Sequence, residues 1–438
     1  MDREGSTGSG SESRAGPGTR AGPEPRTGAR LVLLVGLLFG LAYLAYTFTT
    51  RPGAVALDFE VYYFAAEAVL DGGPLYGVSP VGVDYLVYAY PPLTVLAFLP
   101  FTLLPPFVAY IVFTALNLAA GVLAARLTIG FLDRHGRTLG RADRALVYAF
   151  VALSVHAMPS TVFGQVNLPL ALAFVAGFVW LDRAAEGGDG PAGRWESRAG
   201  VAFGLAAFVK AFPALVGVWL LRRRAWRAVE TAVLTGVVGL GLGLLALGPD
   251  TSLAYVTEAL LPRANDDAFA GGLDPGAAYV TVRRPLSVLF PGLGPIGLTA
   301  AALVVVVPAV GALYARLDAG TIVGRLVGAY ATVAGILAVL PSFPVYHVLL
   351  YFPVVPLLYV LEGRPYRTFV AGALLWTLSV RFDDIRAVLD PLGGEGIAAA
   401  LRPLFTLATP SLVGLAVMFL ACRLALGPDA MAAADGDP

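Results

Sequence analysis

One carboxylate of this chain stands out because its neighbours are apolar and aromatic. Asp58 follows the first long apolar segment, 31–49, and its surroundings over 57–63 read LDFEVYY. A carboxylate in a water-poor place binds its proton more tightly, and this suits a general base that takes a proton from a hydroxyl. Two other interpretations fit the same residues: a solvated loop carboxylate, and an N-cap for a helix over 59–70.

Two side-chain amides stand together before a later apolar segment. Gln165 and Asn167 follow Gly164, and Asn167 begins the segment 167–182. Amides at that position can bind the hydroxyls of a ligand. Asn is also a favoured helix cap, so a capping role fits equally well.

The single lysine lies inside an apolar stretch. Lys210 interrupts the segment 199–221, and Pro213 follows it. An ionisable group in such a segment usually faces the protein interior or a cavity. Lys210 therefore either pairs with an anionic phosphate or extends to the inner membrane surface.

Two adjacent arginines and one histidine complete the candidates. Arg283 and Arg284 lie in a long loop, 249–294, where they either bind phosphate through the planar guanidinium or anchor the chain at the interface. His347 follows Tyr346 at the start of an apolar segment. It is either a site residue or a structural hydrogen-bonding group.

The elements that must position these residues are apolar helices. The chain is 57% hydrophobic and 14% charged, whereas soluble domains carry about 25% charge. Apolar runs of about 17–25 residues match a hydrocarbon core about 30 Å thick. The sequence predicts an all-α polytopic membrane protein with about 10–12 membrane helices. The predicted spans are 31–49, 106–126, 145–158, 167–182, 228–247, 295–315, 326–341, 346–361, 367–380 and 404–423.

Arginines define the predicted orientation. Segment 199–221 has arginines on both flanks, so a pair of half-membrane helices broken at Lys210–Pro213 satisfies the positive-inside rule. With that hairpin, both termini face the cytoplasm, and the polar candidates above, Lys210 excepted, fall at the outer face. On this topology Lys210 lies deep, toward the inner side. The arginines that the rule places outside, and that need another reason, are Arg51, Arg263, Arg283, Arg284, Arg381, Arg386 and Arg402.

The chain ends are polar, and the rest forms one unit. We expect residues 1–29 to be a disordered cytoplasmic tail, 30–424 a single transmembrane catalytic domain, and 425–438 a disordered acidic tail. The formal net charge is zero, which gives no electrostatic case for binding nucleic acid. The sequence has no His-x-x-x-His motif, no paired cysteines and no phosphate loop, so we expect neither a metal nor a cofactor.

Six short motifs together resemble those of glycosyltransferase family 87, over about residues 31–361. They are Asp58 followed by Tyr62-Tyr63, Gly72-x-x-Leu75-Tyr76, Tyr88-x-Tyr90-Pro91-Pro92, Gly164-Gln165-x-Asn167, Lys210-x-x-Pro213 before a basic cluster, and Ser342-x-x-x-Tyr346-His347. Family members are membrane glycosyltransferases of the C-type fold, similar to polyprenol-phosphate-mannose-dependent mannosyltransferases. The last motif departs from the common tryptophan-containing form.

The resemblance implies a specific reaction. The implied donor is a hexose, mannose by family precedent, on polyprenyl or dolichyl phosphate, and the implied acceptor is a hydroxyl of a lipid or lipid-linked glycan at the outer face. Asp58 is implied as the general base of an inverting, metal-independent transfer, and His347 lies near the donor phosphate or the acceptor. The implied substrate-binding residues are Tyr62, Tyr63, Tyr90, Gln165, Asn167, Lys210, Arg283 and Arg284.

Two other classes of protein fit a chain of apolar helices. A transporter or lipid flippase would also place polar groups among the helices, but such proteins often show matched halves and a midplane site. No internal repeat is visible in this sequence. A non-catalytic assembly scaffold is the third interpretation, and it predicts that Asp58 is dispensable.

Overall fold

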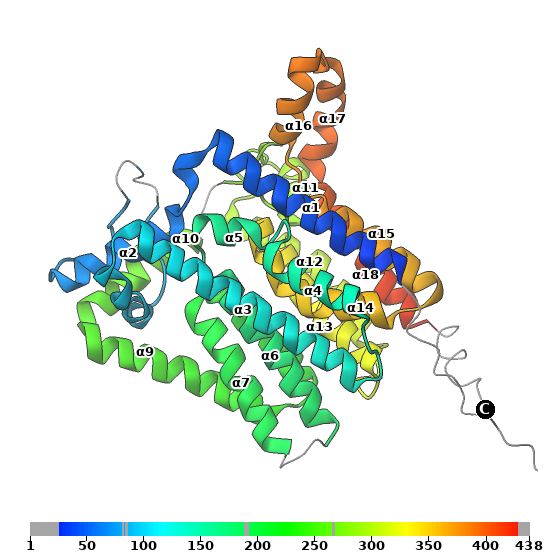
Figure 1. The fold of residues 1–438 in the computed structure, drawn as a ribbon, viewed down its shortest axis with the longest axis horizontal. Coiled ribbons are helices and arrows are strands. Elements are labelled where there is room, and N and C mark those ends of the chain that lie inside the picture. Colours follow the sequence, from blue (N-terminus) through cyan, green and yellow to red (C-terminus); the bar gives the residue numbers. More distant parts are fainter. Residues whose placement is uncertain (1–25, 81–82, 84–85, 188–191, 265–267, 428–438) are drawn as a thin grey trace, which may run out of the picture.

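The computed structural model describes residues 26–80, 83, 86–187, 192–264 and 268–427, and these residues form helices and connecting segments without a strand (Figure 1). The predicted all-α class is therefore confirmed. Most of the two predicted tails lies outside the described residues. Where the chain is described, α1 begins at Thr27, inside the segment expected to be a tail.

Among the described residues, six helices are long and apolar enough to cross a membrane. They are α1 (Thr27–Thr50), α3 (Pro106–Arg134), α6 (Asn167–Ala185), α9 with the π-helical turn that continues it (Trp226–Leu260), α12 (Pro295–Tyr314) and α13 (Ile322–Val339). A seventh candidate is the pair α17 (Glu395–Leu407) and α18 (Pro410–Ala425), which is bent by 51°. Thr409 caps α18 and Pro410 begins it, which explains the break.

The other described helices are shorter or more polar. The α-helices among them are α2 (Leu57–Leu70), α4 (Arg141–Leu153), α5 (Met158–Phe163), α7 (Ala192–Val209), α8 (Gly217–Arg222), α10 (Leu261–Ala264), α11 (Arg283–Leu289), α14 (Tyr351–Val360), α15 (Gly363–Thr377) and α16 (Phe382–Leu389). Tighter 3₁₀ turns connect them at Pro52–Ala54, Pro92–Ala97, Leu99–Leu103, Phe212–Val216, Pro344–Leu350 and Asp390–Leu392.

Large apolar side chains cover the outside of the bundle. On α9 and α12, Leu245, Ile296 and Val304 are 82%, 77% and 73% exposed. Contiguous apolar surface of this kind is suited to lipid rather than to water. By contrast, every residue of α14 is buried, so this apolar helix lies at the centre of the bundle.

The chain reverses at Lys210, as the sequence predicted. In its second half α7 lies against the first turns of α9, where a Cβ added to Gly204 would lie 2.7 Å from the Ala232 carbonyl oxygen. At its end, Phe208 packs on Gly239, further along α9. The two helices therefore run parallel, so the segment between them, Phe212–Arg222, must return in the opposite direction.

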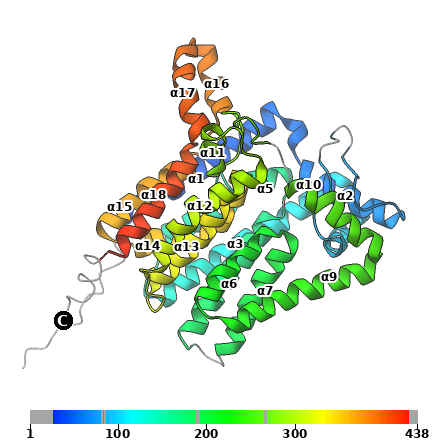
Figure 2. The same cartoon turned by 180° about the vertical axis from the view of Figure 1, so that it is seen from behind.

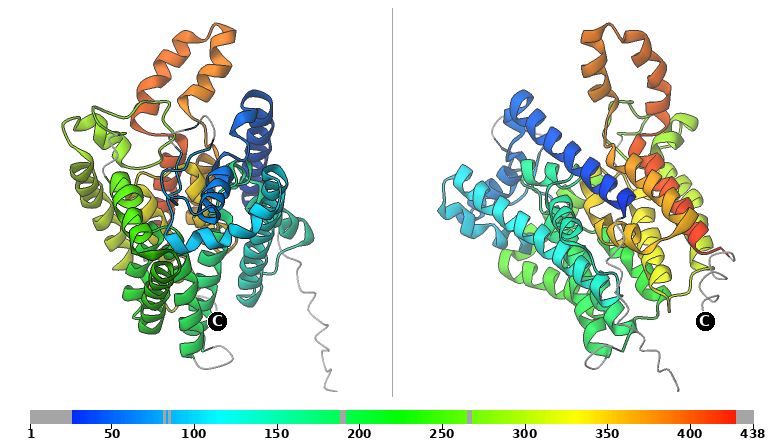
Figure 3. Two further views of the ribbon diagram at one scale, coloured as in Figure 1. Left: turned by 90° about the vertical axis from the view of Figure 1, so that its left-hand side faces the viewer. Right: turned by 45° about the vertical axis from the view of Figure 1, so that its right-hand side comes forward.

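Short elements gather at one end of the bundle. In Figure 1, α2 lies at the left, α5 and α11 lie toward the upper part and the α16–α17 pair lies at the top, whereas the last part of α18 lies toward the lower right. The view from behind in Figure 2 and the side views in Figure 3 show the same division. The candidate residues lie on or near these short elements, so the candidate site lies at this end of the bundle.

Candidate active site

Asp58 is held at the start of α2 by a turn rather than by a cap. Ala56 has a left-handed conformation (φ 67°), and its N–H donates to the Val162 carbonyl oxygen at 2.8 Å. The N-cap of α2 is Ala56, and no side chain caps the helix. The Asp58 carboxylate therefore does not serve as the N-cap that the sequence allowed.

Glycine is required where the turn before α6 approaches α2. Gly164 has φ 76°, and a Cβ there would lie 2.5 Å from Cβ of Phe59. The positive φ strains any other residue by about 1–2 kcal/mol, before the clash is counted. This close approach brings Gln165 to Asp58.

Four polar side chains form one continuous hydrogen-bonded row, which we call the polar relay: Asp58, Gln165, Asn167 and Lys210. The Lys210 ammonium donates to Oδ1 of Asn167 at 2.7 Å, and Nδ2 of Asn167 donates to Oε1 of Gln165 at 2.5 Å. Nε2 of Gln165 then donates to Oδ2 of Asp58 at 2.7 Å. In each bond the donor lies on the Lys210 side and the acceptor on the Asp58 side. The polar relay therefore has an ammonium at one end, a carboxylate at the other, and two aligned amides between them.

Aromatic rings surround the ammonium end of the polar relay. The Lys210 nitrogen lies 4.5 Å from the centre of the Tyr346 ring and 5.8 Å from that of Tyr90. Ring faces attract a cation at such distances. Lys210 thus points to the start of α6 and not to the inner surface, and the expectation that it lies deep on the inner side is corrected. The reversal of the chain carries it there.

The three predicted tyrosines separate into two groups. The Tyr62 and Tyr90 hydroxyls are 2.9 Å apart, and Tyr90 is also next to Lys210. Burial raises the pKa of the Tyr62 hydroxyl well above its usual range, so it keeps its proton at neutral pH. Tyr63 instead donates to the Leu104 carbonyl oxygen at 3.0 Å and packs on Phe59. Tyr63 thus links α2 to the segment that contains Leu104 and does not join the polar relay.

Opposing effects act on the Asp58 carboxyl. Burial raises its pKa, while the hydrogen bond from Gln165 and the charge of Lys210 lower it. The net direction is upward, as expected for a carboxyl that is largely removed from water. Asp58, Gln165 and Lys210 are nevertheless only half-buried, so a ligand can reach them.

His347 lies behind this site in an aromatic environment. It is fully buried, and its Nδ1 accepts a hydrogen bond from Nε1 of Trp376 at 2.9 Å. Its Nε2 has no hydrogen-bond partner among the described residues, and the His156 ring is 5.0 Å away. The structure thus gives His347 a structural hydrogen bond and places its neighbour Tyr346, rather than its own ring, against Lys210.

The adjacent arginines bind backbone oxygens. The Arg284 guanidinium donates to the carbonyl oxygens of Phe405 at 2.8 Å, Tyr279 at 3.2 Å and Asp274 at 3.4 Å, and also to that of Ala277. Nε of Arg283 donates to the Val339 carbonyl oxygen at 2.8 Å. Both side chains are buried. The structure does not bring them into the polar relay.

Two of the arginines that the positive-inside rule does not explain pair with nearby carboxylates. Arg381 pairs with Asp384 at 3.0 Å, and Arg386 pairs with Asp390 at 3.4 Å. These short-range pairs, like the carbonyl contacts of Arg284, give a reason for keeping arginines on the predicted outer side.

Residues of metal-binding type meet at the other end of α6. His135, Asp182 and Glu186 place their ligand atoms within 4.8 Å of one another. Nε of Arg325 is 2.7 Å from the Asp182 carboxylate, and the Arg134 guanidinium is 3.6 Å from it. Asp182 is therefore already paired with two arginines. At 1.5 Å per residue, Asp182 lies about 22 Å along α6 from Asn167. This cluster is therefore separate from the polar relay.

Sequence reasoning did not select two members of the site. Tyr346 faces the Lys210 ammonium, and Oγ of Ser160 accepts from Asn167 at 3.3 Å. Tyr346 belongs to the motif that contains His347, so its signal was present but was assigned to the histidine. Ser160 had no signal, because it joins the site only through the turn at Gly164.

Comparison with known proteins adds relatives of known name. The chain is 30% identical over 239 residues to the polyprenol-phosphate-mannose-dependent alpha-(1-2)-phosphatidylinositol pentamannoside mannosyltransferase of Mycolicibacterium smegmatis, covering 53% of this chain and 52% of that protein. It is 30% identical over 260 residues to the polyprenol-phosphate-mannose-dependent alpha-(1-2)-phosphatidylinositol mannoside mannosyltransferase of Mycobacterium tuberculosis, covering 54% of this chain and 57% of that protein. The chain thus spans about half the length of the curated relatives it matches.

The family model for glycosyltransferase family 87 matches residues 88–342. The matched part contains Tyr90, Gln165, Asn167 and Lys210, and it ends before His347 and begins after Asp58. It covers more than half of the 438 residues. The motifs, the helical architecture and this match together place the chain in one family, and the protein belongs to glycosyltransferase family 87.

Proposed function

We propose that this protein transfers a hexose, mannose in the named relatives, from a polyprenyl or dolichyl phosphate to a hydroxyl of a lipid or lipid-linked glycan. The observation that carries the proposal is the polar relay, which holds a carboxylate and an ammonium at the two ends of one hydrogen-bonded row. A sugar transfer from a phosphate needs both charges. One removes the proton of the acceptor, and the other stabilises the departing phosphate.

The proposed reaction is a single displacement. Asp58 accepts the proton of the acceptor hydroxyl, and the acceptor oxygen forms a bond to the anomeric carbon while the bond from that carbon to the phosphate oxygen breaks. Attack from the side opposite the phosphate inverts the anomeric centre. The polyprenyl phosphate leaves with the electron pair, and the proton stays on Asp58. Burial raises the pKa of Asp58 and makes the carboxylate a stronger base.

Lys210 is the proposed partner of the phosphate. The guanidinium of Arg284 already donates to backbone carbonyl oxygens, whereas Lys210 is half-buried and lies beside half-buried Tyr90 and Tyr346. A phosphate could therefore approach its ammonium more easily. Tyr62 and Tyr90 are proposed to contact the sugar, and Gln165 and Asn167 to orient the two charged groups. We propose His347 as a positioning residue behind Tyr346.

The reaction is proposed to need no metal and no cofactor, because Lys210 supplies positive charge at the leaving group. We expect EDTA to leave the transfer rate unchanged. A rate that falls with EDTA and returns with a divalent cation would contradict this part of the proposal.

Transfer in proteoliposomes tests the proposed function. The full chain is supplied with a panel of polyprenyl-phosphate hexoses and an alkyl mannoside acceptor, and products are identified by mass spectrometry. We expect Asp58→Asn to lower kcat by about 10²–10⁴-fold, whereas Asp71→Asn, an exposed acid at the end of α2, keeps wild-type activity. Full transfer by Asp58→Asn would refute the mechanism.

The same vesicles separate the enzyme from a transporter or flippase. A flippase would move a labelled polyprenyl-phosphate hexose across the bilayer without forming a glycosylated product. Movement of lipid with no product from any donor would favour that alternative. The named relatives and the family favour transfer.

A further inference from the structure

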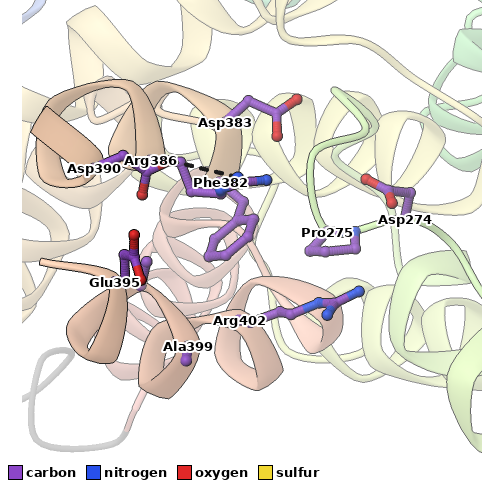
Figure 4. Close-up of a pocket in the computed structure, with 10 residues that line it drawn as sticks. Asp274, Pro275, Phe382, Asp383, Arg386, Asp390, Glu395, Ala399 and Arg402 are labelled. Carbon is purple, nitrogen blue, oxygen red and sulfur yellow. Dashed lines mark hydrogen bonds and ion pairs between the residues drawn. The ribbon is translucent and has the colours of Figure 1, made fainter.

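A polar cavity lies beside the α16–α17 pair, apart from the polar relay. Its volume is about 510 Å³, within the range of small-molecule sites. Asp383, Arg386 and Asp390 come from α16 and the turn after it, Glu395 and Arg402 come from α17, and Asp274 with Pro275 comes from the loop before α11 (Figure 4). We call this cavity the hairpin pocket.

The polar groups of the hairpin pocket are of two kinds. Asp390 and Glu395 lie on one side in Figure 4, Asp274 lies on the other, and Phe382 lies between them. Arg386 is paired with Asp390 at 3.4 Å. Within the described part of the chain, the side chains of Asp383, Glu395 and Arg402 have no hydrogen-bond or ion-pair partner, so acceptors and donors are both available to a ligand.

The balance of charge selects the class of ligand. Four carboxylates and two guanidiniums line the hairpin pocket, which disfavours an anion such as a phosphate. Carboxylates accept and guanidiniums donate at several positions each. A neutral polyol offers hydroxyls that both donate and accept, and therefore satisfies both kinds of group at once. The cavity volume suits a ligand of more than one sugar ring.

Arg284 holds the two walls of the hairpin pocket together. Its guanidinium donates to the Phe405 carbonyl oxygen on α17 and to the Asp274 carbonyl oxygen on the facing loop. The same two walls also meet at Gly276, which lies directly against the Asp383 carboxylate and has no room for a side chain. A buried arginine that donates to both walls keeps the cavity preformed, and a preformed site binds without a cost of ordering.

A row of aromatic rings links the hairpin pocket to the polar relay. The loop that contributes Asp274 continues to Tyr279, whose ring centre is 4.4 Å from that of Phe343. Phe343 is 6.1 Å from Tyr346, and Tyr346 lies against Lys210. A molecule that extends from the relay to the hairpin pocket would thus cross aromatic surface, on which the apolar faces of sugar rings can pack.

We propose that the hairpin pocket binds a neutral oligosaccharide part of the acceptor, beyond the sugar that receives the new bond. The proposed role in acceptor recognition rests on the proposed function, whereas the binding of an oligosaccharide to the hairpin pocket does not depend on it. The α16–α17 pair follows the residues matched by the family model, so this pocket would set which glycans this particular chain extends.

Binding of soluble probes tests the proposal without turnover. The full chain in nanodiscs is titrated with mannotriose, with trilysine and with inorganic phosphate, and binding is followed by calorimetry. We expect mannotriose to bind, and Arg402→Ala and Glu395→Gln each to weaken it about ten-fold, the effect of losing one charged hydrogen bond. The matched controls Arg51→Ala and Asp71→Asn should bind as the wild type does.

Kinetics then separate this proposal from the proposed function. With octyl trimannoside as acceptor, the pocket variants should raise KM about ten-fold at unchanged kcat, and with octyl mannoside they should change neither constant. Equal effects on both acceptors, no effect on either, or tighter binding of trilysine or phosphate than of mannotriose would overturn the hairpin pocket. A wild-type protein that binds mannotriose there but transfers no sugar would refute only the proposed function.

Discussion

The ammonium of Lys210 donates to Oδ1 of Asn167 at 2.7 Å and thereby joins the reversal of the α7–α8 segment to the first residue of α6. These residues are 43 positions apart in the chain. Through Asn167 and Gln165, the same bond connects Lys210 with Asp58 on α2. Three separate elements therefore meet in one row of hydrogen bonds, and each end of that row carries a charge.

Replacing the ammonium should slow the reaction while leaving the protein folded. We expect Lys210→Met to lower kcat by about 10²–10³-fold, the usual effect of removing one group that stabilises developing charge. Lys210→Arg keeps the charge and should retain more activity than Lys210→Met. Thermal unfolding in detergent checks that both variants fold, because Lys210→Met also removes the hydrogen bond to Asn167. Equal activity of the two variants would show that the charge is not needed.

The activity should depend on pH through Asp58. Only the ionised carboxylate accepts a proton, so kcat/KM falls as pH falls through the pKa of Asp58. Burial raises that pKa, and we expect the acid limb of the pH profile to lie above the usual range for aspartate. Because the charge of Lys210 lowers the pKa of Asp58, Lys210→Met should move the acid limb to still higher pH. An acid limb that stays in place in the residual activity of Lys210→Met would contradict the electrostatic coupling.

The ionised carboxylate of Asp58 should also affect stability. When folding raises the pKa of a carboxyl, the folded protein loses stability as pH rises through that pKa. The reason is that the ionised form is less favourable in the folded protein than in the unfolded chain. At neutral pH, Asp58→Asn removes this unfavourable ionised form. We expect its melting temperature to equal or exceed that of the wild type, even though its activity is lost. A clearly lower melting temperature would mean that Asp58 has a structural role.

The turn at Gly164 should be intolerant of a side chain. Gly164→Ala combines a positive φ with a Cβ 2.5 Å from Phe59, and we expect it to lower the free energy of unfolding by about 1–2 kcal/mol or more. It should also reduce kcat, because the displaced turn carries Gln165 away from Asp58. Gly53→Ala is the matched control, since a Cβ there meets nothing within 4 Å. Similar behaviour of the two variants would argue against this explanation.

The orientation of the bundle is open to chemical labelling. In a Cys422→Ala background, Asp58→Cys should react with a membrane-impermeant maleimide added to intact cells, because the site is proposed to face outward. A cysteine in place of Ser197, on α7 near the arginine-rich loop, should react only after the membrane is opened. The reverse pattern would invert the proposed topology.

Much of the architecture follows from local chemistry that a sequence displays. Apolar runs of membrane length, arginines on chosen loops and the interruption at Lys210–Pro213 predicted the helices and the hairpin. Asp58, Gln165, Asn167 and Lys210 were candidates because charged or amide groups are rare beside apolar segments. The sequence did not predict the partners of these side chains. The same residues allowed caps, interfacial anchors or ligands, and composition does not distinguish these.

The sequence by itself determined that this chain is a bundle of apolar helices with a small set of polar residues that apolar packing does not explain. Only the tertiary structure decided which of those residues lie together. It assembled Asp58, Gln165, Asn167 and Lys210 into one relay, directed Arg284 to backbone carbonyl oxygens, and placed Tyr346 rather than His347 against the ammonium. The physical reason is that periodicity and charge fix the position of a residue along a helix, whereas hydrogen-bond partners depend on how distant segments turn and pack.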